Sequence, residues 1–244
     1  MRSKNLIKRG GILLATTAIV LIGGFFVVSY ALAAHTTTST VDRTEVKGGS
    51  IAGYDFTVIN NGADPIYKIT VNAASGFSID ASTIVCPSNL NKDVSSSVLK
   101  AVCASSDPFD PASVLPSGSQ SHITFSATAP IDNALLAWNI VTKDSNMGAE
   151  YTDTGAETLV DSLSPTTTAD LGVYDPATGW TKDTVTVTLT SVDTGSDVAS
   201  ILYSTGVSAP SISYTTPFQL SESGIYPITY SATDNVGNVE PIVT

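Results

Sequence analysis

The chain has 244 residues, 42% of them hydrophobic and only 14% charged, with a formal net charge of −11. An acidic chain repels phosphate, so no nucleic-acid partner is expected. The two histidines and two cysteines leave almost no material for a His-based zinc site or a Ser-His-Asp triad. We therefore expect no cofactor and no enzymatic activity.

Residues 1–34 have the composition of an export segment. Arg2, Lys4, Lys8 and Arg9 precede residues 12–34, an apolar stretch that carries no charge. As an α-helix this stretch would reach about 35 Å, which is enough to cross a hydrocarbon core of about 30 Å. Bases on the N-terminal side keep that end in the cytoplasm. The remainder of the chain is therefore predicted to be exported.

Two interpretations of residues 1–34 stay open. Ala31-Leu32-Ala33 fits the cleavage site of a signal peptide, whereas the length of the apolar stretch favours an uncleaved membrane anchor. Without the four N-terminal bases the chain keeps 11 − 4 = 7 bases against 22 acids. Either way, we expect the protein on the extracellular face of the membrane, with its N-terminus inside, or secreted.

Residues 35–40, His35-Thr36-Thr37-Thr38-Ser39-Thr40, form a polar run without apolar periodicity. Ser/Thr-rich runs of this kind are typical of flexible linkers. The run is predicted to be an extended tether that holds the following domain away from the membrane. The alternative is that it is the mobile start of a mature chain.

Beyond residue 40 the hydrophobic pattern has a period of two, which predicts strands with one buried and one wet face. No segment after residue 40 predicts an amphipathic helix. The clearest alternating runs are Tyr54-Asp55-Phe56-Thr57-Val58, Ile69-Thr70-Val71, Phe77-Ser78-Ile79, Ile123-Thr124-Phe125-Ser126-Ala127 and Val185-Thr186-Val187-Thr188-Leu189-Thr190. Many short strands separated by turn residues predict β-sandwiches.

A Ser/Thr/Pro-rich stretch around residues 161–168 has little to bury and predicts a domain boundary. We expect an all-β protein with one antiparallel sandwich over residues 41–162 and another over residues 163–244. Both would follow the N-terminal hydrophobic helix.

The second predicted domain resembles an Ig-like module of bacterial and archaeal surface proteins. The motifs that carry the resemblance are Val185-Thr186-Val187-Thr188-Leu189-Thr190, Val198-Ala199-Ser200-Ile201 with Tyr203, Tyr214 to Ser221, Tyr226 with Tyr230, and Asp234-Asn235-Val236-Gly237-Asn238-Val239-Glu240. The resemblance implies an Ig-like fold that serves as a spacer or adhesive unit.

That family usually has a longer final strand. Here the sequence stops at Thr244, so we expect either a clipped edge strand or a fragment of a longer protein. The first predicted domain resembles, more loosely, Ig-like repeats of prokaryotic envelope proteins, through residues 53–62. This looser resemblance implies no function.

Cys86 and Cys103 both lie outside the membrane and are predicted to form a disulfide, because exported proteins meet oxidising conditions. Closing so short a loop is worth about 3 kcal/mol in the chain-entropy model. Because the two positions are close together in the sequence, we expect a local staple across a loop or hairpin.

Asp193, Asp197 and Asp234, with Asn235 and Asn238, could gather at one end of the second domain. Calcium prefers six to eight oxygen ligands of this kind. Asp and Asn are also typical turn residues for backbone reasons alone. Turn chemistry is the favoured interpretation and a calcium site is the alternative.

The remaining candidate residues are expected to have structural roles and not chemical ones. Trp138 is expected in a core, and Trp180, beside a turn, is expected to be partly exposed. Tyr226 is expected either to form a tyrosine corner or to be an ordinary half-buried tyrosine. His122 is expected on the surface.

These features predict a non-catalytic structural or interaction protein of the prokaryotic cell surface. Its partners would be the membrane, if the helix is uncleaved, and a cell-envelope protein or polysaccharide. Two alternatives remain: a carbohydrate-binding module, and the non-catalytic part of a larger secreted enzyme.

Overall fold

The computed structural model describes residues 35–107, 110–144, 148, 150–172, 175 and 177–244. The predicted signal peptide or membrane anchor falls on residues 1–34 and lies outside the described residues. Within the described ranges, no helix has the length and apolar character needed to cross a membrane.

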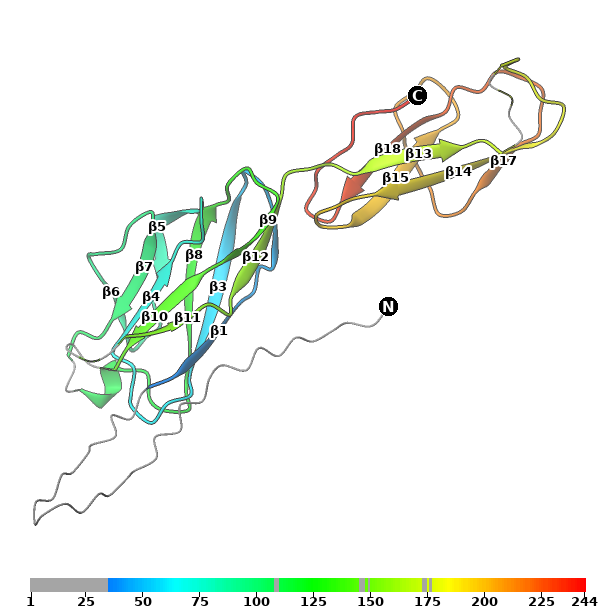
Figure 1. The fold of residues 1–244 in the computed structure, drawn as a ribbon. Helices are drawn as coiled ribbons and strands as arrows, with labels where there is room; N and C mark the ends of the chain where they lie inside the picture. Colours follow the sequence, from blue (N-terminus) through cyan, green and yellow to red (C-terminus); the bar gives the residue numbers. More distant parts are fainter. Residues whose placement is uncertain (1–34, 108–109, 145–147, 149, 173–174, 176) are drawn as a thin grey trace, which may run out of the picture.

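The described chain is almost entirely β, as the alternation predicts, and forms two sandwiches joined end to end (Figure 1). Its one described helical element is a 3₁₀ turn, η1 (Pro111–Ser113). The first sandwich contains β1 to β12, and the second contains β13 to β18. Residues 162–165 connect them.

Two antiparallel sheets face each other in the first sandwich, with strand orders β1-β3-β8-β5 and β11-β10-β4-β7-β6. A smaller sheet, β2-β12-β9, leads toward the second sandwich, and in it β2 and β12 run parallel. The strands are β1 (Thr37–Val41), β2 (Glu45–Lys47), β3 (Ile51–Asn60), β4 (Lys68–Asn72), β5 (Ser78–Val85), β6 (Asn91–Lys92), β7 (Lys100–Ala104), β8 (Gln120–Thr128), β9 (Ala134–Ala137), β10 (Asn139–Lys143), β11 (Glu150–Asp153) and β12 (Glu157–Asp161).

Aromatic side chains fill the centre of the first sandwich. Trp138 is completely buried, as predicted, with its ring centroid 4.7 Å from that of Phe77 and 5.0 Å from that of Phe56. Its indole N–H donates to the Thr158 hydroxyl at 3.0 Å, so burying the ring leaves no unsatisfied donor. The alternating residues of β3 and β8 supply the rest of this layer.

The Cys86–Cys103 disulfide forms as predicted, with 5.7 Å between the two Cα atoms. The prediction of a local staple is right about the short separation of 17 positions and wrong about what the bridge joins. Cys86 follows β5 in one sheet, and Cys103 belongs to β7 in the other. The chain passes from one sheet to the other between these two cysteines, which are 17 positions apart. The disulfide therefore closes a short loop and also joins the two sheets.

The predicted tether over residues 35–40 is also wrong. Thr37–Val41 forms β1, which pairs antiparallel with β3, and its side chains are alternately buried and exposed. Val41 fills one of its three buried positions, and the other two are filled by the polar residues Thr37 and Ser39. Their hydroxyls find partners inside the fold: Ser39 donates to Asp153 at 2.7 Å, and Thr37 lies 3.4 Å from the Thr142 hydroxyl. These hydrogen bonds offset the cost of burying the hydroxyls.

The second sandwich packs two three-stranded sheets, β13-β14-β17 and β16-β15-β18. Its buried apolar cluster consists of Val187, Leu189 and Tyr230, and half-buried residues such as Tyr203 and Phe218 pack around them. The chain after β18 returns along that strand, with bridges Thr233↔Val239 and Tyr230↔Val243. The strands are β13 (Thr166–Asp170), β14 (Val185–Val192), β15 (Val198–Ser204), β16 (Ile212–Ser213), β17 (Phe218–Leu220) and β18 (Thr229–Asp234).

A tyrosine in this sandwich does anchor its hydroxyl on the backbone, but at a position that the sequence did not suggest. The Tyr214 hydroxyl accepts a hydrogen bond from the Leu189 N–H at 3.0 Å, which links the two halves of the core. Tyr226 is half-buried, with its ring against Gly224. Its second predicted role, an ordinary half-buried tyrosine, is the one that the structure favours.

Candidate functional site at the junction of the sandwiches

The first sandwich meets the second at Asp161, the last residue of β12, whose side chain is fully buried. One carboxylate oxygen accepts hydrogen bonds from both the backbone N–H and the hydroxyl of Ser196, each at 2.8 Å. The other accepts the Leu163 N–H at 3.0 Å. The Asp161 carbonyl accepts an N–H from the Asn238 side chain at 3.1 Å. We call these contacts the Asp161 junction.

Gly195 allows the two sandwiches to come this close. A Cβ atom at this position would overlap the Asp161 carboxylate. The glycine is therefore required by close approach, and not by a left-handed backbone angle. Any larger residue would push the β14–β15 turn away from Asp161.

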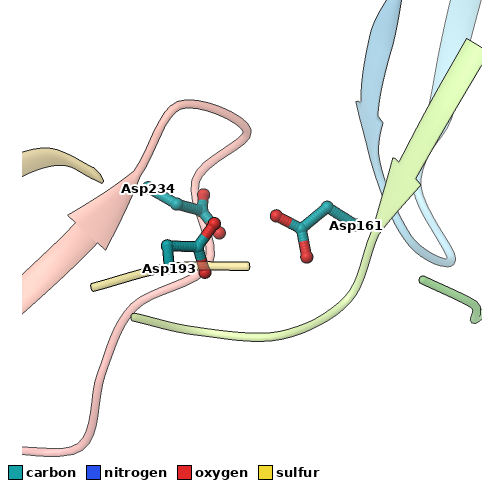
Figure 2. Close-up of side chains that lie close together, drawn as sticks. All are labelled: Asp161, Asp193 and Asp234. Carbon is teal, nitrogen blue, oxygen red and sulfur yellow. The ribbon is translucent and has the colours of Figure 1, made fainter. Parts of the chain in front are cut away.

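Three carboxylates gather at the junction (Figure 2). One oxygen from each of Asp161, Asp193 and Asp234 lies within 4.8 Å of the others. Asp234 is buried and accepts N–H groups from Val236 and Asn238, at 3.0 and 2.8 Å. Asp193 is half-buried and accepts the Gly195 N–H at 3.0 Å. Backbone and amide donors therefore offset much of the negative charge.

The electrostatics of Asp161 follow from these contacts. Burial is the largest single influence and would raise its pKa, but the hydrogen bonds from Ser196 and Leu163 together lower the pKa below its ordinary value. Asp161 is thus held as a carboxylate. Among the described residues no Lys, Arg or His forms an ion pair with these three acids.

The predicted aspartate cluster forms only in part. Asp193 and Asp234 come together, joined by Asp161 from the other sandwich. Asp197 stays outside the group, has a left-handed φ of 65° and accepts the Asn235 N–H through its carbonyl. Asn235 and Asn238 use their side-chain N–H groups as hydrogen-bond donors here. Calcium binding at this end of the second sandwich stays the alternative to the predicted turn chemistry.

A groove of about 730 Å³ runs beside the junction, between the β2–β3 region and the loop that contains Asn235 and Val236. The Lys47 ammonium group spans the two sides by donating to the Gly237 carbonyl at 2.8 Å. This hydrogen bond is a second contact between the sandwiches, beside the Asp161 junction. The sequence offered no signal for Asp161 or Lys47, because each pairs with a loop far along the chain.

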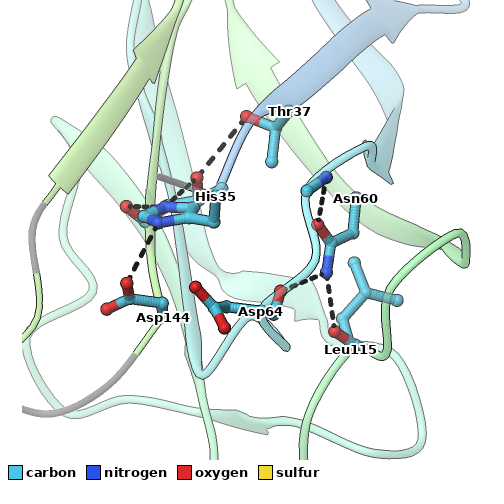
Figure 3. A network of polar contacts seen from close by, with 8 residues as sticks. His35, Thr37, Asn60, Asp64, Leu115 and Asp144 are labelled. Carbon is cyan, nitrogen blue, oxygen red and sulfur yellow. Dashed lines mark hydrogen bonds and ion pairs between the residues drawn. The ribbon is translucent and has the colours of Figure 1, made fainter. Parts of the chain in front are cut away.

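The far end of the first sandwich holds a buried polar network around His35 (Figure 3). His35 donates through Nε2 to the Thr142 carbonyl at 3.0 Å, and its Nδ1 lies 3.5 Å from Asp144. Asn60 donates to the carbonyls of Asp64 and Leu115 at 2.9 and 3.2 Å. These contacts fix β1 and its neighbouring loop in place, so His35 has a structural role.

The other predicted positions are at the surface. His122 is exposed, as predicted, and contacts Asp55 on the neighbouring strand at 3.0 Å. Trp180 is 66% exposed, which confirms its predicted position. The structure does not bring either residue into the Asp161 junction.

Comparison with solved structures returns β domains of low sequence identity. A protein from Corynebacterium diphtheriae described as membrane anchored matches with a TM-score of 0.41 and 10% identity, over 55% of this chain and 37% of its own. An immunoglobulin-like protein from Nocardia farcinica matches with a TM-score of 0.33 and 12% identity, over 47% of this chain and 82% of its own.

A cohesin of R. flavefaciens, solved in complex with a dockerin, gives a TM-score of 0.36 and 20% identity, over 54% of this chain and 99% of its own. The chain thus spans little more than a third of the C. diphtheriae protein and nearly all of the cohesin. No protein-family model matches the sequence, and no curated protein matches it.

Proposed function

We propose that the chain is a non-catalytic structural and interaction module of a prokaryotic cell surface, in which the Asp161 junction holds two Ig-like sandwiches as one stiff arm. The observation that carries this proposal is the burial of Asp161 against Ser196, with two hydrogen bonds of 2.8 Å across the boundary. A freely jointed pair of domains would leave this carboxylate in water.

Export is supported by the disulfide, because such bonds persist in oxidising compartments outside the cytosol. The basic residues ahead of the apolar N-terminal stretch support the same compartment. A structural role is supported by the two histidines, which are engaged by Thr142 and Asp55. The arm would present its loops and sheet faces at a distance from the membrane.

Distance measurements between spin labels test the stiffness of the arm. The labels are placed at Val94→Cys in the first sandwich and Val207→Cys in the second, both highly exposed positions. In the full chain we expect one narrow distance distribution. Gly195→Ala should broaden it, because the added methyl group collides with the Asp161 carboxylate.

Gly206→Ala is the matched control, since a Cβ at Gly206 would meet no atom within 4 Å. This variant should keep the narrow distribution. A broad distribution in the unsubstituted chain would mean that the sandwiches move independently, and the stiff-arm proposal would then be abandoned.

A carbohydrate-binding role is a second candidate, favoured by the 66% exposure of Trp180. A flat exposed indole can stack on a sugar ring. Retention on insoluble polysaccharide that disappears with Trp180→Ala would support this role. Retention that is unchanged by the substitution would remove Trp180 as the platform.

A further inference from the structure

Three lysines share the outer face of the five-stranded sheet in the first sandwich. Lys68 on β4 lies directly opposite Lys143 on β10, and Lys100 on β7 lies opposite Asn72 near the other end of β4. They line one shallow hollow of about 320 Å³, together with Thr70, Asn72, Val141 and Glu150. We call this surface the lysine face.

The lysine face contrasts with the rest of the molecule. After the four N-terminal bases, 11 − 4 = 7 bases remain for 22 acids, and three of these seven line this hollow. Like charges directly opposite each other on neighbouring strands destabilise a sheet. The Lys68–Lys143 pair is therefore unfavourable for the stability of the sheet. Residue pairs that are unfavourable for local structure are expected at functional sites.

Two acids moderate the positive charge without removing it. Glu150 forms an ion pair with Lys143 at 2.9 Å. Asp93 accepts hydrogen bonds from Ser95, which lower its pKa most, and the nearby charges of Lys68 and Lys100 lower it further. Among the described residues neither Lys68 nor Lys100 forms an ion pair. Their ammonium groups remain available to an anion from outside.

The spacing of the lysines indicates the kind of anion. Lys100 is level with Asn72, four positions along β4 from Lys68, which corresponds to roughly 13 Å along the strand. One carboxylate or phosphate cannot bridge that separation. The described residues of the lining include no aromatic ring for stacking, but Thr70 and Asn72 provide neutral hydrogen-bonding groups between the cations. A polymer with repeated, well-separated anionic groups fits this arrangement.

We propose that the lysine face binds an anionic polysaccharide of the cell envelope. This proposal rests on the proposed surface function and names the partner class. Double-stranded DNA carries one charge per about 1.7 Å of its axis and is bound through extended basic surfaces. Three well-separated lysines in an acidic protein fit a polymer whose charges are much farther apart, such as a polysaccharide with one anionic group per sugar unit.

Binding is tested with three labelled polymers at low salt: polygalacturonate as a source of carboxylates, polyphosphate as a source of phosphates, and uncharged dextran. We expect the chain to bind polygalacturonate, and to release it as NaCl is raised, because salt screens exposed charges. Dextran should not bind. Polyphosphate should bind more weakly than polygalacturonate, because the many acids elsewhere on this chain repel its denser charge more strongly.

The decisive variant is Lys68→Gln with Lys100→Gln, which keeps most of the side-chain stems and removes two charges. It should weaken polygalacturonate binding by about tenfold, the scale expected for the loss of exposed charge contacts. The matched control is Lys92→Gln with Lys182→Gln, which removes two lysines away from the hollow and should change affinity less than about twofold.

Equal weakening by the two double variants would overturn the proposal, since binding would then depend only on net charge. Tighter binding of polyphosphate than of polygalacturonate would overturn it as well. Failure of the lysine face leaves the spin-label distances unaffected, so it is distinguishable from failure of the stiff arm.

Discussion

The two sandwiches share a fold class but are held together by different means. The first has a continuous buried core around Trp138, Phe56 and Phe125, and a disulfide that joins its sheets. The second has a buried cluster of three apolar side chains and a rim of half-buried ones. Polar contacts take a larger share there: buried Glu240 binds both Thr167 and Ala232.

An alternating strand pattern determines which side chains face inward. It does not determine how completely those side chains are buried. Apolar burial stabilises by roughly 25 cal/mol per Å². The second sandwich encloses fewer apolar side chains, so its stability depends more on hydrogen bonds and on the Asp161 junction. We therefore expect the first sandwich to tolerate loss of the junction and the second to be weakened by it.

The largest expected effect is in the aromatic core of the first sandwich. Trp138→Ala should lower the free energy of unfolding by about 3–5 kcal/mol, because it opens a cavity and leaves the Thr158 hydroxyl without its indole partner. Urea unfolding followed by circular dichroism measures the change. Trp180→Ala, which removes the same side chain from an exposed position, is the control and should cost far less.

Loss of the disulfide should have the next largest effect. Replacing both Cys86 and Cys103 by Ser is expected to lower the free energy of unfolding by about 3 kcal/mol. Without the bond, the unfolded chain regains the conformational entropy that closure of the loop removes. Differential scanning calorimetry should show a lower melting temperature for the first sandwich alone. An equal fall in the second would show that the sandwiches unfold as one unit.

In the second sandwich, Glu240→Gln should lower the free energy of unfolding by roughly 2 kcal/mol. The carboxamide has an NH₂ group in place of one carboxylate oxygen, so one buried donor loses its acceptor. The carboxylate accepts the Thr167 N–H at 2.7 Å through Oε1, and the Ala232 N–H at 3.1 Å and the Thr167 hydroxyl at 2.6 Å through Oε2. Thermal unfolding followed by amide NMR signals of β14 and β18 tests this. Glu222→Gln, at an exposed position, should change nothing.

The junction should loosen in acid. The pKa of Asp161 is lowered in the folded protein, so its contribution to stability is fully present above the ordinary aspartate pKa of about 3.8. That contribution is lost as the pH falls through the lowered folded value. The spin-label distance distribution should therefore stay narrow from pH 7 to about pH 4 and broaden only below about pH 4. Broadening near pH 6 would mean that another group controls the junction.

The smallest effect is expected for calcium removal. Hydrogen bonds already occupy both carboxylate oxygens of Asp161 and of Asp234, so the junction is expected to form without a metal. EDTA should leave the melting temperature unchanged. A rise in melting temperature with millimolar calcium that is lost in Asp193→Asn would establish the calcium alternative.

The sequence predicted the features that depend on local patterning. Period-two alternation located β3, β4, β8 and β14, and the apolar setting of Trp138 indicated its burial. Features built from polar residues were missed. β1 was not predicted because Thr37 and Ser39 occupy two of its three buried positions. Their partners, Thr142 and Asp153, lie far along the chain in β10 and β11.

The Asp161 junction was missed for a related reason. Asp161 belongs to a stretch whose composition predicts an exposed linker, and only the folded chain brings Ser196 and Gly195 against it. Asp193 and Asp234 were candidates because turn residues near strand ends lie at the same end of a sandwich. Asp197 was a candidate for the same reason, but the structure, which gives it a left-handed backbone conformation, places it outside the group.

Hydrogen exchange followed by mass spectrometry compares the two sandwiches and the junction in one experiment. We expect the slowest exchange in β3, β4 and β8, faster exchange in β14, β15 and β18, and a protected amide at Ser196. Gly195→Ala should expose Ser196 and speed exchange in the second sandwich while β3 and β8 stay unchanged. Equal protection of both sandwiches, with Ser196 unaffected by the substitution, would contradict two unequal sandwiches coupled through Asp161.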